Sequence, residues 1–369
     1  MLEALMEPRR ALALAGAYRR LAERALAGDA LEVDEGRVVL GTPDDELAEL
    51  LWAAYAVRSR HFGRRVKLCV LNNTRSGLCP EDCGYCSQSA VSTADIARYR
   101  RKPVTELVAA AHRAVAAGAR RYCMVTSARG PSADDIDHFG RAARAIRAVL
   151  PQLELCVSLG IMGDDEARAL RAAGVDYVNH NLNTSRRHYP AICSTHSYDD
   201  RVATVESARR AGLGACSGVI VGMGETDDDL IDVAGALARL RVESLPVNFL
   251  HPIDGTPLGD REPPPVGRCL RALALFRLTN PRAEIRAAGG RERCLGGAQG
   301  LALFAANSVF VDGYLTTTGQ AHHDAAAMIE ALGFEVEGSA VPVGAAAFRD
   351  GLDGRAEREE GRGQWTSSW

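Results

Sequence analysis

The pattern of apolar and polar positions changes near residue 63 of this 369-residue chain. Before that point, "AYRRLAERALAG" and "GTPDDELAELLWAAYAVRSRHFG" repeat apolar residues at helical spacing. Beyond it, short β-branched runs alternate with alanine-rich stretches of helical periodicity, several of which end in glycine. We therefore expect an N-terminal helical cap over residues 1–63, followed by a repeating strand–helix unit.

Eight segments beyond the cap have the length and composition of buried strands. Helix-like stretches such as "VTELVAAAHRAVAAG" separate them. This alternation predicts an α/β fold, a (β/α)8 TIM-type barrel over residues 64–335, with its active site at the carboxyl ends of the strands. A doubly wound sheet is disfavoured because the first turn lacks G-x-G-x-x-G. The predicted strands are 66–72, 120–127, 153–160, 175–182, 213–222, 243–250, 283–289 and 308–313.

The C-terminal extension, residues 336–369, ends in "DGLDGRAEREEGRGQWTSSW". This charged, glycine-rich segment has no hydrophobic period, so we expect its end to be disordered. In the whole chain, apolar residues make up 47%, charged residues 25%, and the net charge is -3. These values predict a globular protein without the basic field that nucleic acid requires.

The sequence also bears on membrane association and compartment. No apolar run approaches the roughly 18 residues that a membrane span needs, and the N-terminus does not have the pattern of a secretory signal. We therefore expect no membrane partner and a cytoplasmic location. In such a reducing compartment, the ten cysteines of the chain are better suited to metal or redox chemistry than to disulfides.

Three cysteines lie within eight residues after the first predicted strand, in "GLCPEDCGYCSQS". Cys79, Cys83 and Cys86 follow the spacing C-x3-C-x2-C, whereas a closed zinc site or an ordinary ferredoxin loop recruits four ligands. One interpretation is a structural zinc loop that borrows a distant ligand. The other is an iron–sulfur cubane held at three corners, with one iron open to a substrate or cofactor.

Four further residues lie singly on different predicted strands: Cys123, Cys156, Cys216 and Arg286. Because side chains alternate along a strand, each can point into the barrel lumen. A lone buried cysteine usually packs as a small hydrophobe, but a buried arginine requires compensating charge, which thiolates and the sulfides of an anionic cluster would supply.

The remaining cysteines match no ligand pattern, so we predict that they are packing or surface thiols. They are Cys69, Cys193, Cys269 and Cys294.

The loop spacing, with Tyr85 before the last cysteine, resembles the signature of radical S-adenosylmethionine (radical SAM) enzymes. The phrases "DYVNHNLNTS", "CSGVIVGMGET", "PVNFLHPIDGTPL" and "GGRE" resemble the biotin synthase family over about residues 20–335. This resemblance implies two clusters. A 4Fe-4S cluster would be held by Cys79, Cys83 and Cys86, and a 2Fe-2S cluster by Cys123, Cys156, Cys216 and Arg286.

The resemblance also implies an activity. S-adenosylmethionine bound at the open iron would generate a deoxyadenosyl radical, and sulfur from the 2Fe-2S cluster would be inserted between C6 and C9 of dethiobiotin to form biotin. No catalytic side chain beyond the cluster ligands is expected. A flavodoxin or ferredoxin-type protein would supply electrons, and the family is commonly homodimeric. The alternatives are a related single-cluster radical enzyme and a non-catalytic metal-binding barrel.

Several residues near the predicted barrel mouth have the chemistry to bind S-adenosylmethionine or the substrate. Amides both donate and accept, which suits a cyclic urea or a ribose diol, although loop capping is an equal alternative. By resemblance, an apolar residue of the fifth strand would pack near adenine. For His180 we predict a structural hydrogen-bonding role. The predicted binding residues are Tyr85, Asn181, Asn183, Ile220 and Asn248.

Overall fold

The computed structural model describes residues 7–77 and 79–338. We predicted disorder at the end of the C-terminal extension. From residue 339 onward this extension lies outside the described residues. The helices are α1 (Glu7–Ala27), α2 (Val33–Leu40), α3 (Leu47–Phe62), α4 (Val104–Ala116), α5 (Ala133–Val149), α6 (Asp164–Ala172), α7 (Tyr198–Arg210), α8 (Asp227–Arg239), α9 (Val266–Thr279), α10 (Arg291–Leu295) and α11 (His322–Ala331), with short 3-10 helices η2 (Asp44–Glu46), η3 (Tyr189–Ala191) and η4 (Gly296–Phe304). The strands are β1 (Arg65–Arg75), β2 (Arg121–Thr126), β3 (Glu154–Ser158), β4 (Tyr177–Asn179), β5 (Gly214–Cys216), β6 (Val219–Val221), β7 (Ser244–Phe249), β8 (Glu284–Ala287), β9 (Ser308–Val311) and β10 (Glu335–Val336).

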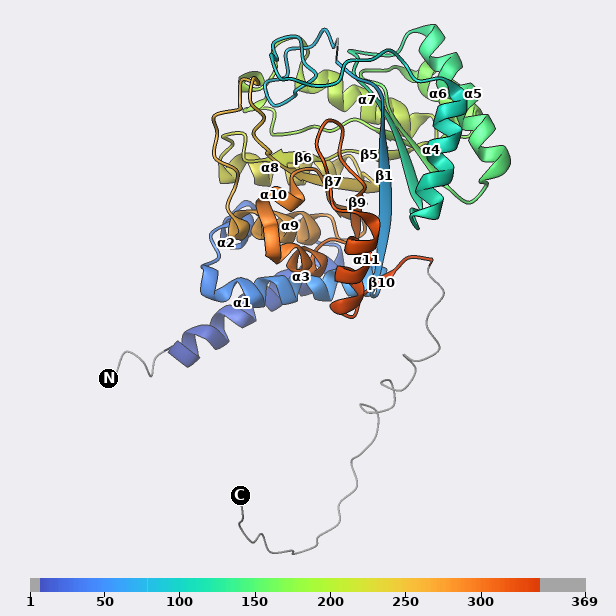
Figure 1. Cartoon of the computed structure of the whole chain (residues 1–369). Coiled ribbons are helices and arrows are strands. Elements are labelled where there is room, and N and C mark those ends of the chain that lie inside the picture. Colours follow the sequence, from blue (N-terminus) through green and yellow to red (C-terminus); the bar gives the residue numbers. More distant parts are fainter. Residues whose placement is uncertain (1–6, 78, 339–369) are drawn as a thin grey trace, which may run out of the picture. The chain divides into compact units, whose positions relative to one another are not determined.

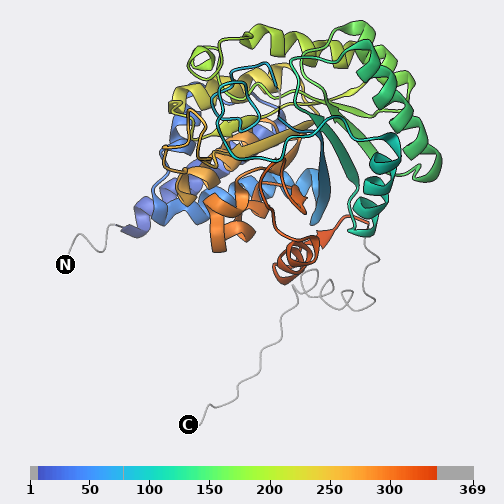
Figure 2. The ribbon, with the colours of Figure 1, turned by 45° about the horizontal axis from the view of Figure 1, so that its top comes forward.

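Parallel strands close into a barrel in the order β1-β2-β3-β4-β5-β7-β8-β9, and β9 pairs back with β1. Helices surround the strands on the outside (Figure 2), so the predicted (β/α)8 barrel is confirmed. Most strand positions are buried, and in β7 all six residues of "SLPVNF" are buried, including the polar Ser244 and Asn248. Outside the closed ring, β10 pairs with the start of β1, Val66 opposite Val336.

The fifth barrel position is not the single continuous strand that we predicted over 213–222. It is divided into β5 and β6, both of which pair with β7, through Cys216 opposite Ser244 and Val219 opposite Val247. Gly218 lies in the break, where a Cβ atom would stand 1.8 Å from the carbonyl oxygen of Pro246. Only glycine allows the two backbones to approach this closely, so the interruption is built into the sequence.

Three of the barrel helices begin at a Ser or Thr whose side chain accepts a hydrogen bond from an Asp backbone N–H three residues later. In each case the Asp carboxylate in turn accepts from the backbone of the capping residue, so two free donors of the first turn are satisfied. These reciprocal pairs set the start of α5, α7 and α8 and thereby the lengths of the preceding loops. The pairs are Ser132 with Asp135, Ser197 with Asp200, and Thr226 with Asp229.

The N-terminal helices and the long β1–α4 connection lie at opposite ends of the barrel. In Figure 1, α1 and α3 lie below the strands, while the connection over residues 76–103 lies above them, where β1 ends. Helix α3 packs against α1 and α9. The three-cysteine loop therefore lies at the carboxyl ends of the strands, where barrel enzymes carry their sites. The boundaries predicted at 63 and 335 stay predictions.

Candidate active site

A cavity of about 270 Å³ opens at the carboxyl ends of the strands. Eleven of the twelve residues that we selected from the sequence line it, and Cys83 is the exception. They come from the loop after β1 and from six different barrel positions, so the tertiary structure gathers residues more than 200 positions apart. The eleven are Cys79, Tyr85, Cys86, Cys123, Cys156, Asn181, Asn183, Cys216, Ile220, Asn248 and Arg286.

The inner part of this cavity contains three buried thiols. Cys123 on β2 and Cys156 on β3 are register partners, and Cys156 lies within hydrogen-bond reach of both Cys123 and Cys216. The hydrogen bond from Cys156, assisted by the nearby Arg286 and Arg121, lowers the pKa of Cys216 to about 5. The same contacts raise the pKa of Cys156 well above its ordinary value, so negative charge is favoured on Cys216 and disfavoured on Cys156.

Arg286 on β8 reaches into the same inner region. Its guanidinium lies 4.0 Å from Cys216 Sγ and donates hydrogen bonds to Ser308 Oγ at 3.0 Å and Ser244 Oγ at 3.2 Å. Only 1% of its side chain is exposed, and its nearest carboxylate is Glu284 on the same strand. The predicted fourth member of the inner site thus lies beside the thiols, already oriented by two hydroxyl groups.

Below the thiols, the barrel floor carries charged residues that our sequence reasoning missed. Arg121 pairs with Glu154 at 2.8 Å and with Glu284 at 3.0 Å, and Lys67 pairs with Glu154 at 2.9 Å. Lys67 also lies 3.9 Å from Glu337, so with Arg286 the floor has three cations and three carboxylates, and its charges are balanced. Single charged residues inside apolar strands, such as Arg121 and Glu284, were the signal that could have revealed it.

The three loop cysteines are not equivalent. Cys79 and Cys86 line the cavity, whereas Cys83 is buried and its Sγ lies 3.7 Å from Cys193 Sγ. Burial raises the pKa of Cys86 to about 11. Since metals bind the thiolate, ligation at this loop would release protons.

Two of the selected amides hydrogen-bond to other elements of the protein. Asn248 donates from Nδ2 to Val219 O at 2.9 Å, and its Oδ1 accepts from Gly289 N at 3.0 Å. Asn183 has a φ of 68°, a left-handed conformation that asparagine tolerates, and donates to the Tyr85 hydroxyl at 2.6 Å. Both residues thereby connect separate elements at the mouth of the cavity.

Asn181 and His180 have unused polar atoms toward the cavity. Asn181 Oδ1 accepts from Gly218 N and Asn179 Nδ2, each at 3.1 Å, while its Nδ2 has no hydrogen bond to any described residue. His180 Nε2 is buried and likewise has no partner within the described residues, so the predicted structural hydrogen bond is not found at this nitrogen. Burial lowers the pKa of His180 well below its ordinary value, which keeps the ring neutral.

The donor set fits iron–sulfur groups. Thiolates are the ligands that such clusters prefer, and the inner site offers three of them beside the guanidinium of Arg286. The loop offers Cys79 and Cys86 to the cavity, and the Cys83 side chain would have to turn away from Cys193 to join them.

The fold and the cavity define a class of protein, a barrel with a three-cysteine loop at its mouth. The chain matches the family model of the Radical SAM superfamily over residues 74–237. A model of the Biotin and Thiamin Synthesis associated domain matches residues 246–335. The chain is 48% identical over 351 residues to Biotin synthase 2 of Frankia casuarinae, covering 95% of this chain and 98% of that protein. It is 49% identical over 322 residues to the biotin synthase of Geobacillus kaustophilus, covering 87% and 96%. The chain belongs to the biotin synthase family.

Two solved structures share the fold at low sequence identity. Methylornithine synthase (PylB) superposes with a TM-score of 0.75 at 21% identity, covering 86% of this chain and 97% of that one. The [FeFe]-hydrogenase maturase HydG superposes with a TM-score of 0.74 at 14% identity, covering 88% and 77%. These similarities support the barrel architecture alone.

Proposed function

We propose that this chain converts dethiobiotin to biotin by inserting sulfur between C6 and C9. When bound, a 4Fe-4S cluster with S-adenosylmethionine would supply a deoxyadenosyl radical, and a 2Fe-2S cluster would supply the sulfur. The observation that carries the proposal is the cavity itself, which joins two loop thiols at its mouth to three thiols and Arg286 at its inner end. A substrate between the two groups would be shielded from water and from stray hydrogen donors.

Each part of the cavity has a separate proposed task. Cys79, Cys83 and Cys86 would hold the 4Fe-4S cluster, and Cys123, Cys156, Cys216 and Arg286 would hold the 2Fe-2S cluster. Arg286 and Arg121, whose charges act on Cys216, would partly offset the negative charge of the inner cluster.

Binding between the clusters would use the polar atoms that the protein leaves free. Asn181 Nδ2 and His180 Nε2 supply a donor and a further polar contact for the cyclic urea or for S-adenosylmethionine. Ile220 presents an apolar surface to adenine, while Tyr85 and Asn183 position each other at the mouth through their hydrogen bond.

Growth of a biotin-synthase-deficient host on dethiobiotin tests the function. The wild-type chain should restore growth, Cys83→Ala should not, and Cys269→Ala, which removes a buried thiol of an outer helix, should restore it. An iron-loaded wild-type protein that fails to support growth would overturn the proposed substrate.

Iron content distinguishes the two-cluster reading from a single-cluster radical enzyme. After anaerobic reconstitution, we expect about six irons per chain, falling to about four in Cys216→Ala. An active wild-type protein that never exceeds about four irons would support the single-cluster alternative. Zinc without iron, together with no deoxyadenosine formed from S-adenosylmethionine and dithionite, would support the non-catalytic barrel.

We further propose a cytoplasmic homodimer that takes electrons from a flavodoxin or ferredoxin-type protein. The basis is the family, together with the reducing environment that free thiols and iron–sulfur clusters need. Within the described residues no helix is both long and apolar enough to cross a membrane.

A further inference from the structure

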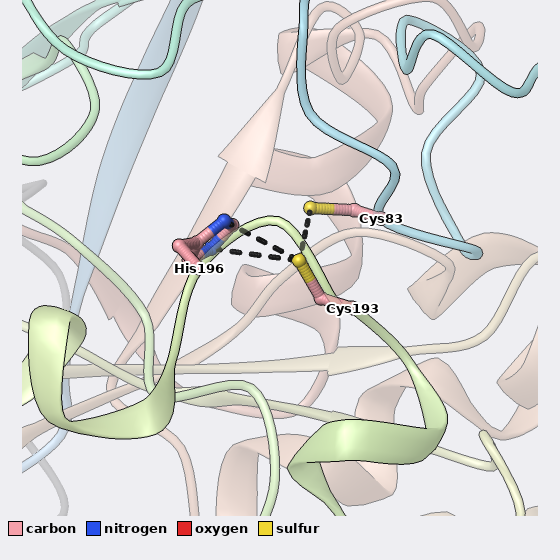
Figure 3. A group of neighbouring side chains, drawn as sticks. All are labelled: Cys83, Cys193 and His196. Carbon is pink, nitrogen blue, oxygen red and sulfur yellow. Dashed lines mark hydrogen bonds between the residues drawn. The ribbon is translucent and has the colours of Figure 1, made fainter.

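Cys83, Cys193 and His196 form a compact buried group beside the cavity, with their polar atoms facing one another (Figure 3). Cys193 Sγ lies 3.7 Å from Cys83 Sγ, 3.3 Å from His196 Nδ1 and 3.8 Å from His196 Nε2. One ligand atom from each residue lies within 4.8 Å of the others. The proposed cluster ligand Cys83 thus has a second set of potential metal-binding partners.

The backbone holds this group together. The segment between η3 and α7 that carries Cys193 and His196 is bonded to the three-cysteine loop, since Gly84 N donates to Ile192 O at 2.9 Å. Asp82 accepts from Ser194 N at 2.9 Å. One main-chain bond and the bond from the Ser194 backbone to the Asp82 carboxylate therefore hold the two segments together.

The spacing fits a tetrahedral metal ion. Two thiolates at about 2.3 Å from a tetrahedral zinc stand roughly 3.8 Å apart, and a thiolate and an imidazole nitrogen roughly 3.6 Å apart. The corresponding distances are 3.7 Å between the sulfurs and 3.8 Å from Cys193 Sγ to His196 Nε2. Asp82 Oδ1 lies 3.2 Å from Cys193 Sγ but already accepts from Ser194 N and Thr195 N, so a water molecule would complete the fourth position.

The surroundings of His196 support the same interpretation. Glu81 contacts Nδ1, an arrangement in which a carboxylate fixes the ring and leaves Nε2 unprotonated. Arg201 donates to Nε2 from Nη2 at 2.8 Å and from Nε at 3.1 Å, so this nitrogen is an acceptor in the metal-free chain, and a metal ion would displace both bonds. Arg201 also donates to Asn181 O at 2.7 Å and would keep that bond after a metal ion replaced its contact with His196.

We propose that Cys83, Cys193 and His196 form a mononuclear site for Zn²⁺, occupied when Cys83 does not ligate the loop cluster. Two thiolates and one imidazole are a zinc donor set, and the same set takes Fe²⁺ more weakly. The two uses of Cys83 exclude each other, so zinc at this site blocks assembly of the loop cluster. This competition rests on the proposed function, whereas metal binding by the three residues does not.

Cobalt titration of the full-length, metal-free and reduced chain tests the site, with Co²⁺ as the spectroscopic substitute for Zn²⁺. The wild-type chain should show tetrahedral bands with thiolate charge transfer. Cys193→Ala and His196→Gln should each weaken this binding at least about tenfold. Cys294→Ala is the matched control. It removes a buried thiol that lies beside the thiol of Cys269, and it should leave the titration unchanged. Circular dichroism establishes that each variant is folded.

A Cys79→Ala variant separates this site from a metal held by the three-cysteine loop alone. We expect Cys79→Ala to bind Co²⁺ as the wild type does. If Cys79→Ala loses the bands while Cys193→Ala keeps them, the loop is the site and the proposal is overturned.

A competition experiment connects the site to cluster assembly. One equivalent of Zn²⁺ added before anaerobic reconstitution should reduce the electron paramagnetic resonance signal of the reduced loop cluster in the wild type. The loss of this signal should be several-fold smaller in Cys193→Ala. Equal loss in both proteins would refute the competition. A host that fails to grow on dethiobiotin would contradict the proposed function and leave the cobalt result intact.

Discussion

Arg121 on β2 and Glu284 on β8 meet across the barrel lumen in a two-point ion pair, with both nitrogen–oxygen distances at 3.0 Å. Their side chains are 1% and 9% exposed. Removing one partner of a buried pair leaves an uncompensated charge, which costs far more than the pair itself contributes. Glu284 also pairs with Arg286, which lines the cavity, so the pair connects barrel stability to the site.

Glu284→Gln should therefore lower the free energy of unfolding of the metal-free chain by about 3–5 kcal/mol, measured by urea titration followed by circular dichroism. Asp137→Asn is a matched control, because it breaks an exposed pair with Arg141 and should cost about 1 kcal/mol or less. Equal effects of the two substitutions would show that the floor charges are solvated.

Arg286→Ala tests whether the two proposed cluster sites act separately. Arg286 lies beside Cys216 in the inner site, whereas the loop cysteines lie at the mouth. We expect the variant to keep deoxyadenosine formation and the loop cluster while biotin formation falls. Loss of the loop cluster in Arg286→Ala, measured by iron content and electron paramagnetic resonance, would contradict this separation.

Gly218→Ala should prevent folding of the barrel, because the added Cβ would collide with the carbonyl of Pro246 at 1.8 Å. We expect a destabilisation above about 4 kcal/mol, seen as loss of soluble protein. Gly297, in η4, has open space where a Cβ would be, so Gly297→Ala should express normally. A soluble Gly218→Ala protein with the wild-type unfolding curve would mean that the two backbones separate at little cost.

Substitution of Asn248 should lower the stability of the chain, whereas substitution of Asn181 should weaken substrate binding. Asn248→Ala breaks bonds to Val219 and Gly289 and should cost about 1–3 kcal/mol of stability. Asn181→Asp keeps the acceptor for Gly218 N but removes the free Nδ2 donor. It should raise the KM for dethiobiotin or S-adenosylmethionine about tenfold while the unfolding curve stays unchanged. An unaltered KM for both molecules would remove Asn181 from the binding site.

Asp229 should make stability sensitive to acid. Burial would raise its pKa, but hydrogen bonds from Ser185, Arg187 and Thr226 prevail and hold the pKa well below its ordinary value of 3.8. The depressed pKa means that the carboxylate stabilises the fold above about pH 4, and that this contribution is lost as the pH falls further.

The difference in Tm between wild type and Asp229→Asn should therefore be largest near neutral pH and shrink by about pH 3. Asp137→Asn, which removes an exposed carboxylate, is measured alongside as the control for a surface substitution. A difference that stays constant from neutral pH to about pH 3 would argue against the lowered pKa.

Much of the architecture could be predicted from local patterns. The strand–helix alternation predicted the barrel, and the positions of Cys123, Cys156, Cys216 and Arg286 on their strands predicted side chains that now lie together. The break at Gly218 could not be predicted from those patterns, because it depends on how closely β7 approaches.

The sequence by itself determined the repeating unit, the three-cysteine loop and the strands that deliver thiols, because these features are encoded in short windows by residue type and period. Only the tertiary structure decided which partners they meet. The residues around Cys83 do not indicate that it contacts Cys193, which lies 110 positions away. In the same way, the residues around Arg121 do not indicate that it pairs with Glu284, 163 positions away. Such contacts follow from barrel closure and loop packing, which no local pattern records.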